Sequence, residues 1–109
     1  DRSFVESTLM DLLSQIPEKF SISQNYPNPF NPQTKMDFSV AQTGKVNIVI
    51  YNLLGQTVKT LVNETMEYGY HSIVWDGHDE LGNPVSSGVY FSEFRARGFR
   101  QSKKMLLLK

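Results

Sequence analysis

No helical architecture accommodates the pattern that begins near Phe20, in which apolar side chains recur at every second position. The alternation is clearest from Met36 to Val40 and from Val46 to Ile50. A two-residue period places alternate side chains on one face of an extended strand. With further strands predicted at residues 57–62, 70–75, 88–96 and from 99 or 100 to 108, the chain carries about seven strands.

Short turn signals separate the predicted strands. They combine glycine, asparagine, aspartate and proline at Thr43-Gly44, residues 52–55, Tyr68-Gly69, Asp76-Gly77, residues 82–84 and Arg97-Gly98. Connections this short join antiparallel neighbours, because parallel strands need crossovers of about a dozen residues or more. The chain is therefore predicted to be all-β, an antiparallel sandwich of two stacked sheets.

Alternation also predicts which side chains face the space between the sheets. Trp75 is the only tryptophan and is expected at the centre of this core. The predicted core residues are Phe38, Val46, Ile48, Ile50, Val58, Ile73, Trp75, Tyr90 and Phe94.

Residues 1–19 are predicted to be a linker ahead of the sandwich, which takes residues 20–109. Apolar side chains recur at spacings of three and four from Val5 to Ile16, which predicts a short helix over residues 3–16. Pro17 ends that pattern. A total of 109 residues suits one domain with one hydrophobic core.

Composition excludes several classes of function. The chain has no cysteine and a net charge of zero, so disulfides and nucleic-acid binding are not expected. Its longest apolar run, Met105 to Leu108, is too short to insert into a membrane. No secretory signal peptide follows Asp1, and such a signal is expected upstream.

Catalytic motifs are missing from the sequence. No Gly-x-Ser-x-Gly elbow marks a nucleophile, and the seven glycines are scattered rather than clustered before a helix. His71 shares a predicted strand face with Ile73 and Trp75, which favours a half-buried packing role. We expect neither enzyme activity nor a cofactor.

One loop carries oxygen-rich side chains that suit a calcium ion, close to His78. The same residue types also cap turns through their own side chains, and the run lacks the spacing of a calcium-binding loop. A structural turn and a weak calcium site are both kept as interpretations. The candidate ligands are Asp76, Asp79, Glu80 and Asn83.

Two surface features also allow two interpretations each. Tyr51, Tyr68 and Tyr70 are either a sugar-binding strip, as in a carbohydrate-binding or adhesive module of a secreted enzyme, or ordinary cross-strand packing. The chain after Leu81 is basic, which suits either a guarded edge strand or a docking tail for a receptor. Its charges are Arg95, Arg97, Arg100, Lys103, Lys104 and Lys109, against Glu93 alone.

The most distinctive segment is rich in asparagine and proline and runs from Asn25 to Pro32. Proline removes backbone donors and fixes φ, so this segment is predicted to be an extended, semi-rigid loop rather than an interior strand. Tyr26 and Phe30 are expected to anchor it to the sandwich.

Residues 18–109 resemble the type A C-terminal sorting domain of type IX secretion. Five motifs occur in the family's order, and the last ends at a terminal lysine. They are the Asn25–Pro32 segment, residues 50–58, Trp75-Asp76-Gly77, Ser87-Gly88-Val89-Tyr90 and residues 104–109. Residues 75–90 are also similar to the immunoglobulin-like part of flagellar hook-capping proteins.

This resemblance implies an immunoglobulin-like sandwich that serves as a non-catalytic secretion and sorting signal. The expected partners are an outer-membrane translocon, a sortase-like peptidase that cleaves in or before the linker, and a cargo domain upstream in the same chain. The expected location is the cell surface or the medium, reached by way of the periplasm.

We expect the secretion machinery to recognise a sheet edge and a basic terminus. Strand addition to an exposed edge is one way in which a partner could bind. The candidate recognition residues are Gly88, Val89, Tyr90, Lys103, Lys104 and Lys109.

Overall fold

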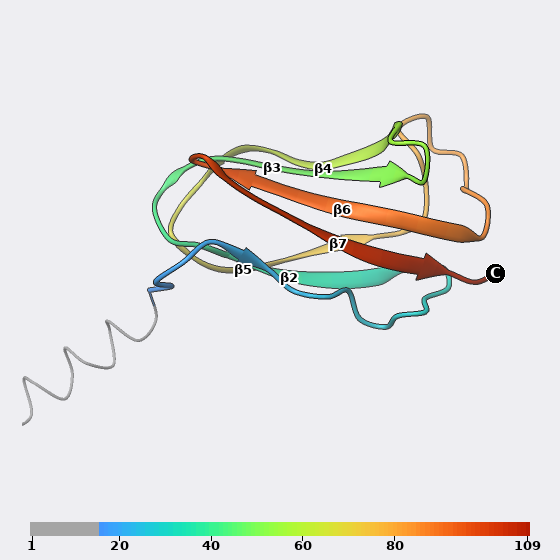
Figure 1. Ribbon diagram of the computed structural model, residues 1–109, viewed down its shortest axis with the longest axis horizontal. Helices are drawn as coiled ribbons and strands as arrows, with labels where there is room; N and C mark the ends of the chain where they lie inside the picture. The colour runs from blue at the N-terminus through green and yellow to red at the C-terminus, as the bar shows by residue number, and fades with distance from the viewer. Residues whose placement is uncertain (1–15) are drawn as a thin grey trace, which may run out of the picture.

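The computed structural model of the protein describes residues 16–109, and within them the predicted strands form (Figure 1). All but the last residue of the helix predicted over residues 3–16, and most of the predicted linker, lie outside this range. The strands are β1 (Ser21–Ile22), β2 (Thr34–Val40), β3 (Gly44–Asn52), β4 (Thr57–Met66), β5 (Gly69–Trp75), β6 (Gly88–Ala96) and β7 (Phe99–Leu107).

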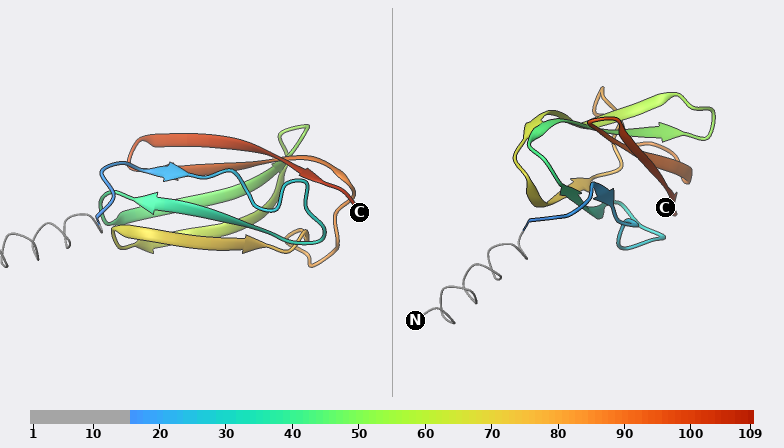
Figure 2. Two further views of the ribbon diagram at one scale, coloured as in Figure 1. Left: turned by 90° about the horizontal axis from the view of Figure 1, so that it is seen from below. Right: turned by 60° about the vertical axis from the view of Figure 1, so that its left-hand side comes forward.

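The strands form two stacked sheets (Figures 1 and 2). One sheet has the order β1-β2-β5 and the other has the order β4-β3-β6-β7. Every neighbouring pair is antiparallel. The predicted antiparallel sandwich of about seven strands is confirmed. No helix within residues 16–109 is long and apolar enough to cross a membrane.

The core between the sheets contains the side chains that alternation predicts. Val58 and Ile73 are only partly buried, although both pack against the core. The other predicted core residues are buried, namely Phe38, Val46, Ile48, Ile50, Trp75, Tyr90 and Phe94. Phe30, Met105 and Leu107 join them and were not in the predicted set.

Trp75 is the last residue of β5, and its side chain lies in this core with no exposed surface. Its ring packs against Phe30 at 5.6 Å and against Tyr90 at 5.2 Å, measured between ring centroids. Its Nε1 donates a hydrogen bond to the carbonyl oxygen of His78 at 3.0 Å, so the one polar atom of the indole is satisfied. Trp75 thus joins the two sheets to the loop that follows β5.

Replacing Trp75 by alanine is expected to lower the free energy of unfolding by about 3–5 kcal/mol, because it removes a buried aromatic and leaves a cavity. Urea denaturation followed by circular dichroism measures the change. Leu53→Ala is the control, since Leu53 is 71% exposed, and should change stability little. Equal stability of the two variants would contradict the burial of Trp75 in the core.

Ser92 on β6 has a buried hydroxyl that finds no hydrogen-bond partner among the described residues. Burying a polar group without a partner costs free energy, so Ser92→Ala is expected to stabilise the protein by up to about 1 kcal/mol. Thermal and urea denaturation test this. A clear loss of stability would mean that the hydroxyl contributes an interaction that its surroundings do not reveal.

Candidate functional site

The Asn25–Pro32 segment lies alongside the last strand, β7, at the end of the molecule where the chain terminates (Figure 2). Phe30 forms a parallel bridge with Leu107. The Phe30 N–H donates to the Leu106 carbonyl at 3.0 Å, and the Leu108 N–H donates to the Phe30 carbonyl at 3.1 Å. The segment therefore acts as an additional short strand on the open edge of the four-stranded sheet.

Two side chains extend this contact. The Leu106 N–H donates to Asn28 Oδ1 at 3.0 Å, and Gln24 Nε2 donates to the Lys104 carbonyl at 2.6 Å. We call Gln24, Asn28 and Phe30, with the β7 groups that they bind, the edge clasp. It satisfies four backbone groups on the free side of β7, which would otherwise be available to another strand. They are the Lys104 carbonyl, the Leu106 N–H and carbonyl, and the Leu108 N–H.

Buried polar contacts hold the clasp segment in shape. Asn25 Nδ2 donates to the Pro27 carbonyl at 3.1 Å and to Thr34 Oγ1 at 3.0 Å. Thr34 Oγ1 in turn donates to the same carbonyl at 2.8 Å. Asn25 and Thr34 are both buried, and a buried network with every member paired rigidifies a loop.

Only one of the two predicted anchors of this segment is buried. Phe30 is 2% exposed and contacts Trp75, as predicted. The prediction for Tyr26 was wrong, because its side chain is 80% exposed. Tyr26 is instead held by its backbone, which exchanges two hydrogen bonds with Lys35 on β2.

The predicted recognition edge needs correction. Gly88, Val89 and Tyr90 begin β6, which lies between β3 and β7 in the sheet, although only Tyr90 of the three is also paired with β3. These residues pair with Leu107, Leu106 and Met105. The edge strand is β7, and the clasp already occupies its C-terminal half. Strand addition by a partner at residues 104–108 would therefore require the clasp to dissociate from β7.

The three candidate lysines do not gather into one patch. Lys103 and Lys104 are neighbours in β7, so their side chains leave opposite faces of the sheet. Lys104 is exposed, whereas Lys103 is half-buried opposite the buried Ser92. Lys109 lies beyond the strand, and its N–H donates to Ser87 Oγ at 2.9 Å.

The three carboxylates among the candidate calcium ligands in the loop after β5 accept hydrogen bonds from backbone N–H groups, whereas Asn83 takes part through its own N–H. Asp79 Oδ1 accepts from the Leu81 and Asn83 N–H groups, and Asp76 Oδ1 accepts from the His78 N–H. Glu80 turns away from this loop, and its Oε1 accepts from the Thr60 N–H on β4 at 2.5 Å. In the part of the chain that is described, no three His, Asp or Glu side chains are grouped to hold a metal ion.

The predicted tyrosine strip is not continuous. Tyr51 faces outward from β3 in the four-stranded sheet, whereas Tyr70 faces outward from β5 in the three-stranded sheet, on the opposite side of the sandwich. Tyr68 is exposed in the connection between β4 and β5. A flat carbohydrate ligand would not contact Tyr51 and Tyr70 together.

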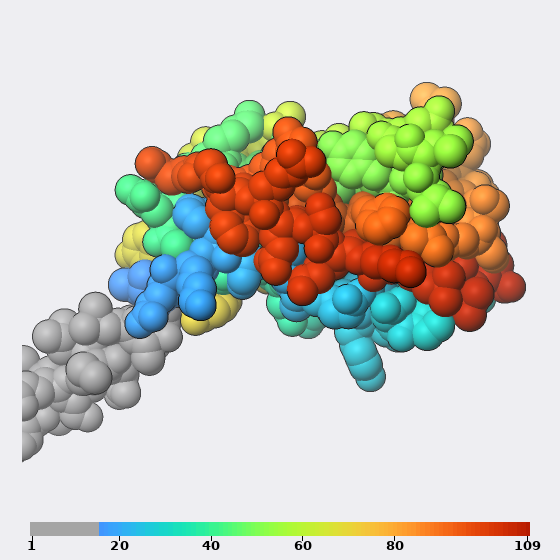
Figure 3. All heavy atoms as spheres, viewed as in Figure 1, coloured from blue at the N-terminus to red at the C-terminus, as the bar shows by residue number. Residues whose placement is uncertain are grey.

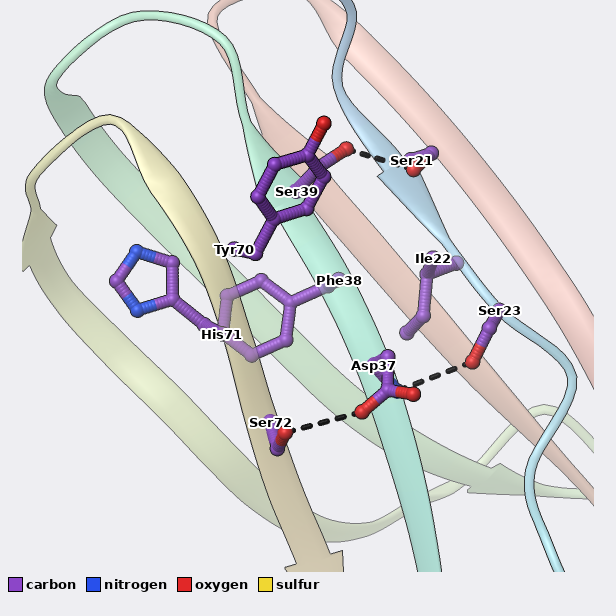
Figure 4. A pocket seen from close by; sticks show the side chains of 9 residues that line it. All are labelled: Ser21, Ile22, Ser23, Asp37, Phe38, Ser39, Tyr70, His71 and Ser72. Carbon is purple, nitrogen blue, oxygen red and sulfur yellow. Dashed lines mark hydrogen bonds between the residues drawn. The ribbon is translucent and has the colours of Figure 1, made fainter. Parts of the chain in front are cut away.

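A shallow hollow of about 420 Å³ lies on the three-stranded sheet beside Tyr70 (Figure 4). Its polar groups already bind one another. Ser72 Oγ donates to Asp37 Oδ1 at 2.9 Å, and the hydroxyls of Ser21 and Ser39 are 2.6 Å apart. These side chains mainly hold β1, β2 and β5 together.

His71, at the same hollow, has the packing role that its strand position predicts. Its ring stacks on Phe38 at 5.3 Å and is half-buried. Its Nε2 is hydrogen-bonded to the Glu67 carbonyl at 2.9 Å.

Glu93 forms an ion-pair cluster that the sequence did not reveal. It lies on the outer face of β6 and is only 8% exposed. Its two carboxylate oxygens accept from Arg95 Nε at 2.6 Å and from Arg100 Nε at 3.0 Å. Arg95 and Arg100 are opposite each other in the β6–β7 register, which the residue spacing alone does not disclose.

Comparisons with known proteins agree with this architecture. The family model of the FlgD Ig-like domain matches residues 26–97. A search of the curated proteins found no match to the chain.

Three solved structures have a similar fold. Dimeric latent PorU from Porphyromonas gingivalis aligns over 83% of this chain with a TM-score of 0.62 and 19% identity. PorZ, described as an essential surface component of the type IX secretion system of the same bacterium, aligns over 84% with a TM-score of 0.54 and 15% identity. FlgD from P. aeruginosa aligns over 69% with a TM-score of 0.50 and 23% identity.

The shares of those proteins that are matched differ widely. This chain covers 9% of the PorU chain and 12% of the PorZ chain, but 60% of the FlgD chain. It therefore corresponds to one small module of PorU and of PorZ. At these identities the likeness establishes the fold.

The edge clasp generates a prediction about local stability. Asn28→Ala removes the acceptor for the Leu106 N–H, and because this site is exposed to water we expect a loss of only about 0.5–1 kcal/mol. Hydrogen exchange of the Leu106 amide should become clearly faster, while amides in the centre of β3 stay protected. Asn31→Ala, an exposed change in the same segment outside the clasp, is the control. Unchanged exchange at Leu106 would contradict the clasp.

Proposed function

The chain belongs to the FlgD Ig-like domain family, and on that premise we propose that it is a non-catalytic C-terminal module that directs an attached cargo protein through type IX secretion. The module carries no chemistry of its own in this proposal. Any catalytic or binding activity belongs to the upstream cargo. The module is recognised by the outer-membrane translocon and by a sortase-like peptidase. The cargo reaches the cell surface or the medium by way of the periplasm.

The edge clasp is the observation that carries the proposal. Two of the five motifs that resemble the sorting domain, the Asn25–Pro32 segment and the terminal strand, are far apart in the sequence but bind each other directly. A receptor that contacts this end of the module would meet both motifs at once. The clasp therefore gives a physical reason for the two motifs to occur together.

The fold of related structures supports the same proposal. PorZ is described as a component of type IX secretion and contains a module of this fold. The alternative, a carbohydrate-binding or adhesive module, has less support because Tyr51 and Tyr70 lie on opposite faces of the sandwich. We also propose that recognition at this end of the module uses side chains around the clasp rather than strand addition, since the clasp occupies the β7 edge at residues 104–108.

Export of a cargo fusion tests the proposal. A reporter enzyme with a signal peptide and this chain at its C-terminus is expected to reach the surface of a bacterium that has type IX secretion. Deleting residues 103–109 should leave the reporter in the periplasm. Because this deletion removes part of β7 and risks unfolding, the exposed double change Lys104→Glu and Lys109→Glu is tested beside it.

The double variant is expected to stay folded, as circular dichroism checks, and to reduce surface delivery. Lys19→Glu, an exposed change near the other end of the sandwich, should export normally. Normal surface delivery of the reporter after deletion of residues 103–109 would refute the sorting role. Binding of the isolated chain to a glycan array would instead favour the carbohydrate-binding alternative.

A further inference from the structure

A hollow of about 380 Å³ lies at the β6–β7 hairpin, on the four-stranded sheet. The strands that form this hairpin are orange and red in Figure 3. The residues that line the hollow include four cations and no carboxylate, although the whole chain has a net charge of zero. The lining cations are Lys45, Arg95, Arg97 and Arg100.

Two of these cations are held in place by one buried carboxylate. Glu93 binds Arg95 and Arg100 through the Nε atom of each, and its own side chain is only 10% exposed. The arginine side chains remain 53% and 66% exposed. A single buried carboxylate therefore orients two guanidinium groups while leaving much of each in contact with solvent, and it neutralises only one of their two charges.

A third cation is positioned by the backbone. Arg97 adopts a left-handed conformation with φ of 43°, which non-glycine residues rarely adopt. Its side chain lies over Gly44, where a Cβ atom would come within 2.9 Å of Arg97 Nε. Its Nη2 donates to the Thr43 carbonyl at 3.3 Å. The hairpin turn and the start of β3 thus hold this guanidinium beside the hollow.

We infer that this hollow binds an acidic, extended peptide segment of a protein partner. Cations kept only for solubility are free to move, whereas three of these four are oriented by specific contacts. Guanidinium groups recognise carboxylates through several parallel hydrogen bonds. Ordering the arginines in advance lowers the entropic cost of binding, which favours a specific ligand over diffuse attraction.

The spacing of the cations favours an extended peptide. Arg95 and Arg100 lie in one row across the sheet beside Asn47, and Lys45 lies in the next outward-facing row of β3. Successive rows on one face of a sheet are two residues apart, which is about 6.8 Å. Carboxylates at alternate positions of an extended peptide have the same separation, so two of them reach both rows together.

Binding of two peptides of equal composition to the whole 109-residue chain tests this inference. One fluorescent peptide alternates glutamate and serine, and the other carries the same glutamates in one block. In an extended peptide the alternating glutamates share a face, so the alternating peptide should bind at least about threefold more tightly. Binding should weaken as sodium chloride rises from about 0.05 M to about 0.5 M.

Charge reversals locate the site. Lys45→Glu and Arg97→Glu should each weaken binding of the alternating peptide by at least about fivefold, since each replaces an attraction by a repulsion. Lys19→Glu changes the net charge equally at an exposed residue that does not line the hollow, and should alter affinity by less than about twofold.

Several results would overturn the inference. They are no measurable binding of the alternating peptide, or equal affinity of the chain for both peptides. An affinity loss with Lys19→Glu as large as that with Lys45→Glu would also overturn it. So would displacement of the bound peptide by inorganic phosphate at a concentration equal to that of the peptide's glutamates. The inference does not rest on the export role, because it is measured on the purified chain.

Discussion

The contact between Phe30 and the end of β7 is the interaction on which the rest of this sandwich depends. The Phe30 backbone closes the sheet edge through two hydrogen bonds, while its ring fills the core against Trp75. One residue therefore couples the edge of one sheet to the packing between both sheets. The prolines around it lack N–H groups, so the segment that covers β7 is itself a poor template for another strand.

The opposite edge of the same sheet is covered in a comparable way. Glu80, in the loop after β5, donates its N–H to the Val58 carbonyl and accepts from the Thr60 N–H with its carboxylate. A side chain that suits a calcium ion on composition grounds thus serves to protect the edge of β4. Each outer strand of the four-stranded sheet is thus covered over part of its length by a loop from elsewhere in the chain. This agrees with a module that partners recognise through its side chains.

Local patterns were enough to predict the strands, the two-sheet architecture and most of the core, because a period of two determines which side chains face inward. They were not enough to predict the order of the strands within each sheet. That β6 is an interior strand, and that Glu93 meets Arg100, both depend on register between strands, which no local pattern contains. The prediction that the Tyr26 ring anchors its segment was wrong because a backbone bridge holds this residue instead.

Because the chain is synthesised from its N-terminus, the Phe30 contact forms late. β7 leaves the ribosome after every other strand described here, so Phe30 has no partner on the sheet until synthesis of Leu106 and Leu108 is finished. A product that stops before these residues keeps an open edge and a loosely held aromatic ring. The packing of Phe30 is therefore complete only in a polypeptide that extends through Leu108.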